Sequence, residues 1–230
     1  MIRHNVDSNG TGEEQIMSGL HLNGHHDSPI QGISVALAQM NSGSDREQNL
    51  SVALDLIDRA AAAGARLVVL PEVWPYLGPE EGNRAHAEPI PGPITDLLAE
   101  RARRHRIYVH GGSIYETRRD DPGMFNTAVV INPDGDIIAK YSKLHMFDVV
   151  LDGVAQYTES ATVTPGDGLA IADIDGFPVG LAICYDLRFP ELFRILALNG
   201  AKTIILPAAF TMMTGKDHWE TLIRARAIEN

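Results

Sequence analysis

The chain has 230 residues, of which 44% are hydrophobic and 21% charged, a balance that is ordinary for a globular protein with a sizeable core. Its formal net charge of −11 argues against a nucleic-acid backbone or an anionic membrane surface as a partner. No apolar run approaches the roughly 20 residues that cross a bilayer, and the N-terminus lacks the apolar segment of a secretory signal, so a cytoplasmic location is expected.

Residues 1–30 differ in composition from the rest of the chain. They are rich in Gly, Asn, Ser, Asp and His and show no sustained apolar periodicity, which predicts a disordered N-terminal extension. His21, His25 and His26 have no accompanying acid or cysteine ligands, so no metal site is expected there. Residues 31–230 are expected to form one domain.

From residue 33 onward, strand and helix patterns alternate. The apolar run at 33–39 predicts a buried strand, Asp45 is suited to cap the helix that follows, and Gly64 is suited to end it. The same reasoning then predicts a strand at 67–70, a helix at 94–105 and a strand at 107–115.

The second half of the chain adds two predicted hairpins. Their strands are 126–131 with 137–141 and 169–174 with 178–183, joined by turns rich in Asn, Pro, Asp and Gly. A helix at 190–199, a strand at 202–206 and a helix at 217–230 complete the predicted elements. Helices between buried strands, mixed with hairpins, indicate α/β layering. The last helix has no stop signal, so the chain is expected to be cut short.

Reactive side chains follow two of the apolar strands. Glu72 comes after the strand at 67–70, and Cys184 comes after the strand at 178–183. Ligands gather at the carboxyl ends of strands in open α/β sheets. If these two strands are parallel neighbours, Glu72 and Cys184 face one pocket.

Cys184 is the only cysteine, so no intramolecular disulfide can form, which is consistent with a reducing compartment. It lies between a strand and a helix, where a sharp turn exposes a side chain to an incoming carbonyl group. A thiol needs a base or a cation nearby to react, and Glu72 and Lys143 are the candidates. The residues alone leave three alternatives open: a buried apolar role for Cys184, a solvated acid at Glu72 and a surface lysine at Lys143.

Four separated motifs in the range 33–230 carry a family resemblance: VVLPE, KYSKLHMFD, CYDLRFPELFR and HWETLIRARAIEN. Together they strongly resemble the nitrilase superfamily of carbon–nitrogen hydrolases, and within it the Nit branch, whose amidases act on ω-amides and deaminated glutathione. The resemblance implies a four-layer α–β–β–α sandwich and pairing of two subunits. It also implies further C-terminal strands beyond the position of Asn230.

The family's Glu–Lys–Cys triad maps onto Glu72, Lys143 and Cys184, and a second family glutamate maps onto Glu159. Without the resemblance, the sequence around Glu159 predicts only an exposed acidic residue in a loop. In the implied mechanism, Glu72 takes the thiol proton, Cys184 attacks the amide carbonyl, and Lys143 and the Tyr185 backbone N–H stabilise the oxyanion. No step needs a metal, nucleotide or flavin, so no cofactor is expected.

The residues around the cysteine also bear on the substrate. Nitrile-cleaving members typically carry Trp-Glu where this chain has Tyr185-Asp186, which favours an amide. Arg188 matches an arginine that holds the substrate carboxylate in similar ω-amidases, a role suited to a planar guanidinium. The alternative is a structural ion pair of Arg188 with Asp186 or Glu191. The expected substrate is therefore a small carboxylate with a terminal amide.

In those relatives, residues matching Phe210 and Thr214 line the acyl pocket, although Phe210 fits ordinary core packing equally well. Other functions compete with the ω-amidase: a carbamoyl amidase or nitrilase of the same superfamily, a non-catalytic association module, or a redox-sensing thiol protein. The intact triad argues against the association module. The absence of a second cysteine argues against the redox sensor.

Overall fold

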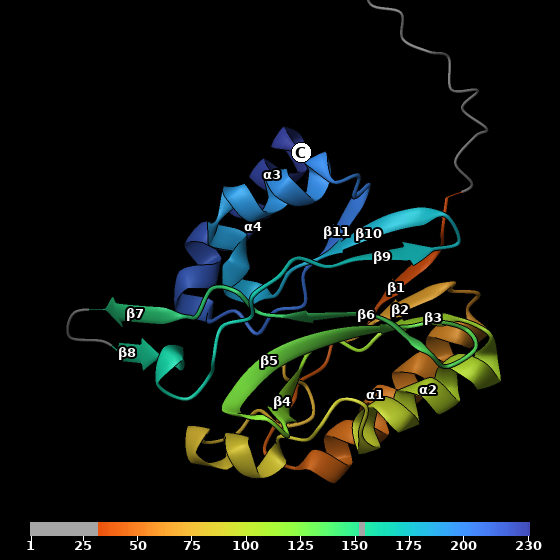
Figure 1. Cartoon of the computed structure of the whole chain (residues 1–230), viewed down its shortest axis with the longest axis horizontal. Helices are drawn as coiled ribbons and strands as arrows, with labels where there is room; N and C mark the ends of the chain where they lie inside the picture. Colours follow the sequence, from red (N-terminus) through yellow and green to blue (C-terminus); the bar gives the residue numbers. More distant parts are fainter. Residues whose placement is uncertain (1–31, 152–154) are drawn as a thin grey trace, which may run out of the picture. The chain divides into compact units, whose positions relative to one another are not determined.

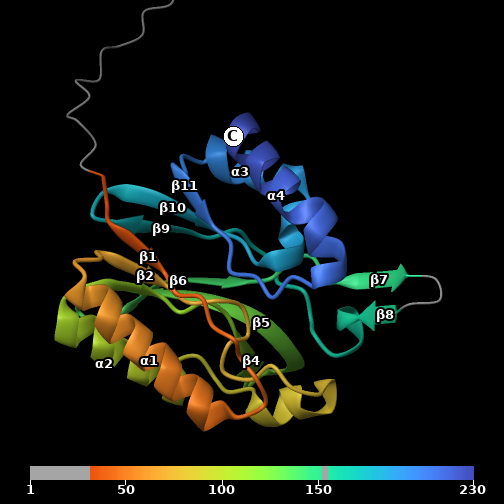
Figure 2. The same cartoon turned by 180° about the vertical axis from the view of Figure 1, so that it is seen from behind.

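Two β-sheets lie face to face, and each carries two helices on its outer side, so four layers follow one another (Figure 1, and from behind in Figure 2). Helices α1 (Arg46–Ala62) and α2 (Pro93–His105) cover the first sheet. Helices α3 (Pro190–Leu198) and α4 (Met212–Glu229) cover the second sheet. The predicted α–β–β–α sandwich is confirmed.

The computed structural model describes residues 32–151 and 155–230. All elements discussed below belong to the unit Ile33–Asn230. The extension predicted for residues 1–30, with its three histidines, lies outside the described residues.

The first sheet is mixed, in the order β1-β2-β3-β5-β4, with β6 also paired to β5. Its parallel strands are β1 (Val35–Leu37), β2 (Leu67–Val69) and β3 (Tyr108–His110). Its antiparallel strands are β4 (Ile114–Arg118), β5 (Asp121–Ile131) and β6 (Ile137–Ser142).

The second sheet places β10 (Phe177–Leu181) between an antiparallel neighbour, β9 (Ile171–Ile174), and a parallel one, β11 (Thr203–Ile205). A separate two-stranded hairpin consists of β7 (Asp148–Leu151) and β8 (Ala155–Thr158). The described residues also form three short 3-10 helices: η1 (Glu80–His86), η2 (Glu159–Ala161) and η3 (Cys184–Arg188).

Alternation along the strands produces two separate cores. In β2, Val68 packs toward Ile57 of α1 and Leu98 of α2, whereas Leu67 and Val69 pack toward the second sheet. The core between the sheets also contains the buried cysteine and residues of β5, β6, β9 and β10. A third cluster joins α3 to the outer face of the second sheet. The reactive thiol is therefore part of the packing between the two sheets.

The predicted strand at 107–115 is wrong, because the structure divides it into β3 and β4 at Gly111 and Gly112. Gly112 has φ of +62°, and a Cβ there would overlap the carbonyl oxygen of Pro71. The two glycines interrupt the strand after His110, and β4 then continues alongside β5, antiparallel to it as β3 is.

One helix boundary, one hairpin and one juxtaposition also differ from expectation. Helix α4 begins at Met212 rather than at 217, because Gly215, a poor helix former, obscures the pattern of the first turn. The β7–β8 hairpin was not predicted. Strands β2 and β10 belong to different sheets, so Glu72 and Cys184 are not carried by parallel neighbours.

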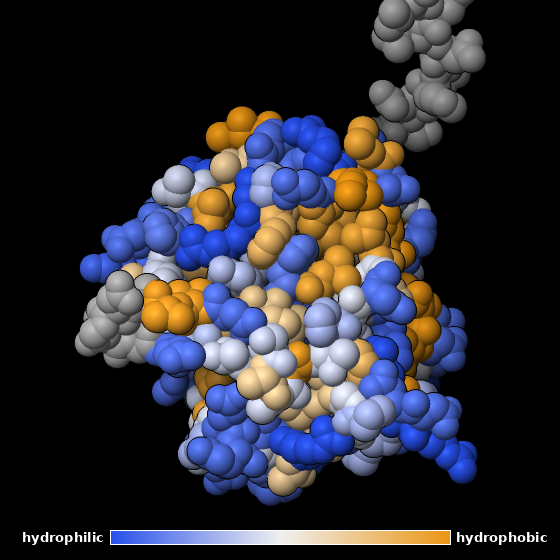
Figure 3. Space-filling view, turned by 60° about the vertical axis from the view of Figure 1, so that its left-hand side comes forward, coloured by the Kyte–Doolittle hydropathy of each residue, from blue (hydrophilic) through white to orange (hydrophobic). Residues whose placement is uncertain are grey.

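Several large apolar side chains remain exposed, including Leu198 on α3 and Met212 and Ile228 on α4. The space-filling view in Figure 3 shows contiguous apolar surface among the hydrophilic atoms of one face. Surface of this kind is typical of an interaction site. Within the described ranges, none of the helices is long and apolar enough to cross a membrane.

Replacing Gly112 by alanine should destabilise the fold more than the same change at Gly64. Both glycines have positive φ, but an added Cβ meets no atom within 4 Å at Gly64 and overlaps the Pro71 carbonyl at Gly112. Gly64→Ala should cost about 1 kcal/mol from backbone strain alone. Gly112→Ala should cost roughly 3 kcal/mol or more, because steric overlap adds to that strain. Urea unfolding of both variants measures the difference, and equal losses would contradict this account.

Candidate active site

A cavity of about 360 Å³ opens where β2 and β10 end, between the two sheets. Glu72, Lys143 and Cys184, predicted from three separate motifs, all line it, and so does Glu159, which the family resemblance implied. Two of them follow strands of the first sheet and one follows a strand of the second. The site is therefore assembled from the edges of both sheets.

Glu72 is buried and is held by three donors. Its Oε1 accepts from Asn126 Nδ2 at 2.9 Å and from Lys143 Nζ at 3.3 Å, and its Oε2 accepts from the Ala209 backbone N at 2.7 Å. The next residue, Val73, has φ of +40°, which is rare for a β-branched residue, and its N–H donates to Ser113 Oγ. A carboxylate accepts about four hydrogen bonds. One position therefore remains on Oε2 for a further donor.

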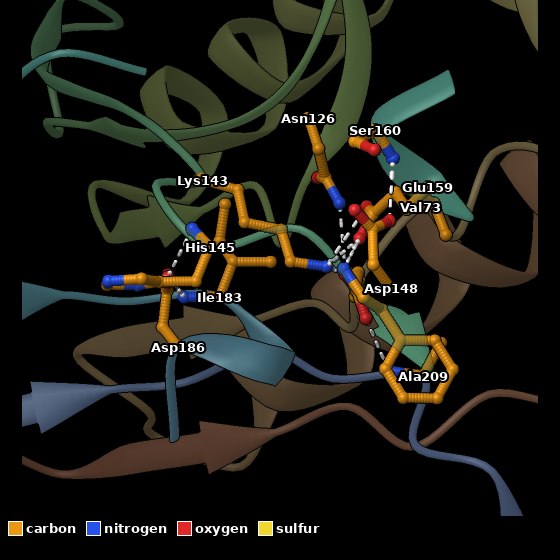
Figure 4. A network of polar contacts seen from close by, with 12 residues as sticks. Val73, Asn126, Lys143, His145, Asp148, Glu159, Ser160, Ile183, Asp186 and Ala209 are labelled. Carbon is orange, nitrogen blue, oxygen red and sulfur yellow. Dashed lines mark hydrogen bonds and ion pairs between the residues drawn. The ribbon is translucent and has the colours of Figure 1, made fainter. Parts of the chain in front are cut away.

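Lys143 is 2% exposed, and its ammonium lies between two carboxylates. Its Nζ is 2.8 Å from Glu159 Oε2 and 3.0 Å from Glu159 Oε1, in addition to the contact with Glu72 (Figure 4). Burial disfavours the charge, but the neighbouring Glu72, Cys184 and Glu159 outweigh burial and raise the pKa of Lys143 above its ordinary value. Lys143 is therefore a fixed cation at neutral pH.

Glu159 is positioned by the base of the β7–β8 hairpin. Its Oε2 accepts from the Phe147 backbone N at 2.7 Å, and its own backbone N donates to the Phe147 carbonyl at 3.3 Å. Next to Glu159 along the chain, Ser160 N donates to Asp148 Oδ1 (Figure 4). The Phe147 ring also packs against Tyr157 and Tyr185, with centroids 5.1 Å away in each case. The hairpin thus supplies both an acid and an aromatic wall of the cavity.

Cys184 begins η3 with φ of +47°, and its backbone N donates to the Pro207 carbonyl at 2.9 Å. The side chain is buried. Burial, followed by the charge of Glu72, raises the pKa of the thiol well above its ordinary value, against the opposing effect of Lys143. The resting group is therefore a neutral thiol beside a carboxylate, and it needs a base to become a nucleophile.

Sequence reasoning missed Asn126, which lines the cavity and donates to Glu72. The available signal was that the apolar strand at 126–131 begins with two polar residues, Asn126 and Thr127. It also missed Tyr115, which lines the cavity and accepts from Asn83 Nδ2 at 3.2 Å. Burial, then the charges of Glu72 and Glu159, raises the pKa of the Tyr115 phenol, so this group stays protonated.

Of the four residues predicted to bind substrate, three line the cavity and one does not. Tyr185, Phe210 and Thr214 line the cavity, whereas Arg188 does not. The Arg188 guanidinium carbon lies 5.8 Å from each of the Tyr185 and Phe210 ring centroids, and its Nη2 is 3.1 Å from His218 Nδ1. The guanidinium thus sits behind two rings of the cavity wall.

The alternative predicted for Arg188 is absent from the described part of the chain, where neither Asp186 nor Glu191 forms an ion pair with it. Among the same residues, no group of three or more His, Cys, Asp or Glu side chains is placed to hold a metal ion.

Comparison with known proteins gives consistent matches. A family model described as carbon-nitrogen hydrolase matches residues 34–230. The chain is 42% identical over 197 residues to the human omega-amidase NIT2, covering 85% of this chain and 70% of that protein. It is 40% identical over 207 residues to the chloroplastic omega-amidase of Arabidopsis thaliana, covering 88% of this chain and 56% of that protein.

The crystal structure of the C. elegans NitFhit protein matches with a TM-score of 0.76 at 35% identity, covering 85% of this chain and 48% of that chain. The present chain therefore spans only part of the length of these proteins. The expected pairing of subunits and the expected cellular location stay predictions.

The Lys143–Glu159 ion pair should show strong energetic coupling. Lys143→Met leaves a buried carboxylate without its cation, and Glu159→Gln removes part of that cost, so the double variant should be more stable than the sum of the single losses implies. A coupling energy of about 1–3 kcal/mol is expected from chemical unfolding.

The control cycle combines Lys143→Met with Asp134→Asn. Asp134 is an exposed acid in the turn at the far end of the β5–β6 hairpin. Its coupling to Lys143 should be close to zero. Equal coupling in the two cycles would show that the pair seen in the cavity does not carry the effect.

Proposed function

Because the chain belongs to the nitrilase superfamily of carbon–nitrogen hydrolases, we propose that it is a thiol amidase acting through a Cys184 acyl-enzyme. The proposed substrate is a small carboxylate with a terminal amide. One observation carries the proposal: a carboxylate held by three donors lies beside the only thiol of the chain, with a fixed cation in the same cavity. Two of the similar proteins are named omega-amidases.

In the proposed first half-reaction, Glu72 takes the proton of the Cys184 thiol, and the sulfur attacks the amide carbonyl carbon. The charge on the carbonyl oxygen develops near Lys143 and the Tyr185 backbone N–H, and donors fixed in advance are the most effective stabilisers of such charge. As the C–N bond breaks, protonated Glu72 returns its proton to the leaving nitrogen. A thioester on Cys184 and free ammonia result.

In the second half-reaction, Glu72 takes a proton from water, the water oxygen attacks the thioester carbonyl, and the C–S bond breaks. The thiol recovers its proton from Glu72. Both carboxylate oxygens of Glu159 contact the ammonium of Lys143. We therefore propose that Glu159 holds this ammonium in place. In this proposal Glu72 performs both proton transfers, and its Oε2 has a hydrogen-bond acceptor position that no donor described above occupies.

The arrangement favours this reaction over the competing functions. A module that served only for association has no need of a buried Glu–Lys–Glu network beside a thiol, because each buried charge costs stability unless it is paired. A redox sensor would need an exposed thiolate, whereas Cys184 is buried and its pKa is raised.

The substrate carboxylate is proposed to bind Arg188. The guanidinium lies behind Tyr185 and Phe210, and its Nη2 is hydrogen-bonded to the ring of His218, the one side-chain hydrogen bond that it makes among the residues that the structure describes. To reach a ligand in the cavity, it has to exchange His218 for the carboxylate. With Arg188 in this role, the enzyme would prefer amides that carry a carboxylate over neutral amides.

Cys184→Ser should lower the hydrolysis rate by more than about 10³-fold while the thermal midpoint stays close to that of the wild type, because the change alters reactivity and hardly alters volume. Ammonia release from a panel of ω-amides measures the rate. As a parallel check, one equivalent of iodoacetamide should inactivate the wild type, since Cys184 is its only thiol. Normal hydrolysis by fully alkylated protein would remove Cys184 from the mechanism.

Arg188→Lys should raise KM by roughly 10- to 100-fold for a carboxylate-bearing amide, because a bidentate contact is lost. KM for a neutral amide of similar size should change by less than about twofold, since that substrate makes no use of the guanidinium. Steady-state kinetics on the two amides gives the comparison. A uniform loss on both would mean that Arg188 only supports the fold, and the substrate class would then be dropped while the thiol amidase is kept.

A further inference from the structure

Asp186 is a fully buried carboxylate whose acceptor positions are all occupied. Its Oδ2 accepts from Tyr141 Oη at 2.7 Å and from the Ile183 backbone N at 2.8 Å. Its Oδ1 accepts from His145 twice, from the backbone N at 3.1 Å and from Nδ1 at 2.7 Å. A carboxylate offers about four such positions. Asp186 therefore has no capacity left for a substrate group.

The donors come from two segments that carry the chemistry. Ile183 directly precedes Cys184, while Tyr141 and His145 stand two residues before and after Lys143. Figure 4 shows Asp186 with Ile183 and His145 at its carboxylate, and Lys143 extending from the same strand end toward Glu159. One side chain thus joins the turn of the nucleophile to the segment of the cation.

This junction holds a strained turn in place, and its own donors are fixed. The positive φ of Cys184 is strained for a residue other than glycine, and such a conformation persists only where surrounding contacts hold it. The His145 ring is itself fixed by stacking on Phe189, with centroids 3.6 Å apart and planes 9° apart. Burial, and then the charge of Asp186, raises the pKa of Tyr141, so its hydroxyl remains a donor.

We propose that Asp186 is a positioning residue that fixes the Cys184 turn against the strand end carrying Lys143. Asp186 does not line the cavity, so it acts on the reaction only through Ile183, Tyr141 and His145. The inference rests on the proposed thiol chemistry. A purely structural role for Asp186 would lower stability without a specific effect on the chemical step.

Two tyrosines of the same core offer a matched comparison. Tyr141 and Tyr108 both lie between the sheets, and each donates its hydroxyl to a carboxylate, Tyr141 to Asp186 and Tyr108 to Asp175 at 3.0 Å. Tyr108 pairs with Leu67 at the end of β3 remote from the cavity. Phenylalanine at either position removes one hydroxyl, but only Tyr141→Phe loosens the proposed junction.

Tyr141→Phe should lower kcat about tenfold and leave KM within about twofold, because a small displacement of reacting groups slows the chemical step. Tyr108→Phe should leave both constants within about twofold. Asp186→Asn, which replaces an acceptor oxygen with a donor, should lower kcat by about 10²-fold with a similarly small effect on KM. Thermal melting of all three variants shows whether any loss of activity follows stability.

The alkylation rate of Cys184 gives a readout that needs no substrate. In folded protein, iodoacetamide should react about fivefold more slowly with Tyr141→Phe than with wild type, because the thiol is displaced from Glu72, and Tyr108→Phe should react normally. Loss of structure would instead expose the buried thiol and speed the reaction. Equal effects in the two phenylalanine variants, or faster alkylation of Tyr141→Phe, would overturn the proposal. If the wild type hydrolyses no amide, the proposed function fails, while the alkylation comparison still decides the role of Asp186.

Discussion

The ammonium of Lys143 is buried, so carboxylates rather than water must neutralise its charge, and much of the site follows from that requirement. An ammonium that is 2% exposed is tolerated only with close anionic partners. Glu72 arrives from the end of β2 and Glu159 from the base of the β7–β8 hairpin, and both reach the same nitrogen. Electrostatic balance thereby fixes the relative positions of three chain segments. The same balance keeps the lysine cationic, as a stabiliser of an oxyanion requires.

The second determinant is the packing of one sheet on the other. Glu72 and Lys143 follow strands of the first sheet, whereas Cys184 and Ala209 follow strands of the second. The distance between the proposed base, Glu72, and the proposed nucleophile, Cys184, is therefore set by the apolar core between the sheets, which includes the cysteine. Polar links also join the two sheets, among them Ala209 N to Glu72 and the Tyr141 hydroxyl to the carboxylate of Asp186. A rigid scaffold of this kind is what precise placement of reacting groups demands.

The sequence was sufficient to predict the elements and residues whose signals are local. Glu72 and Cys184 could be predicted as site residues because each directly follows an apolar strand. Asp45 caps α1, as its side chain suggests. Glu159 has no local signal, because its role depends on a lysine 16 residues earlier. Only the family resemblance identified it. The site of Arg188 could not be predicted in detail, since its contact with His218 joins residues 30 positions apart.

The pairing of Glu159 with Phe147 at the base of the β7–β8 hairpin has a consequence for how such a site can diverge. This hairpin pairs with neither larger sheet, and its root is tied to the cavity through the glutamate that neutralises Lys143. Its aromatic residues form a wall against which a substrate would rest. An insertion or substitution that widens this wall also moves a counter-ion of the lysine. Evolution of a new substrate range through the hairpin is therefore constrained by charge neutrality, whereas Phe210 and Thr214 line the same cavity from a segment that carries no counter-ion of Lys143.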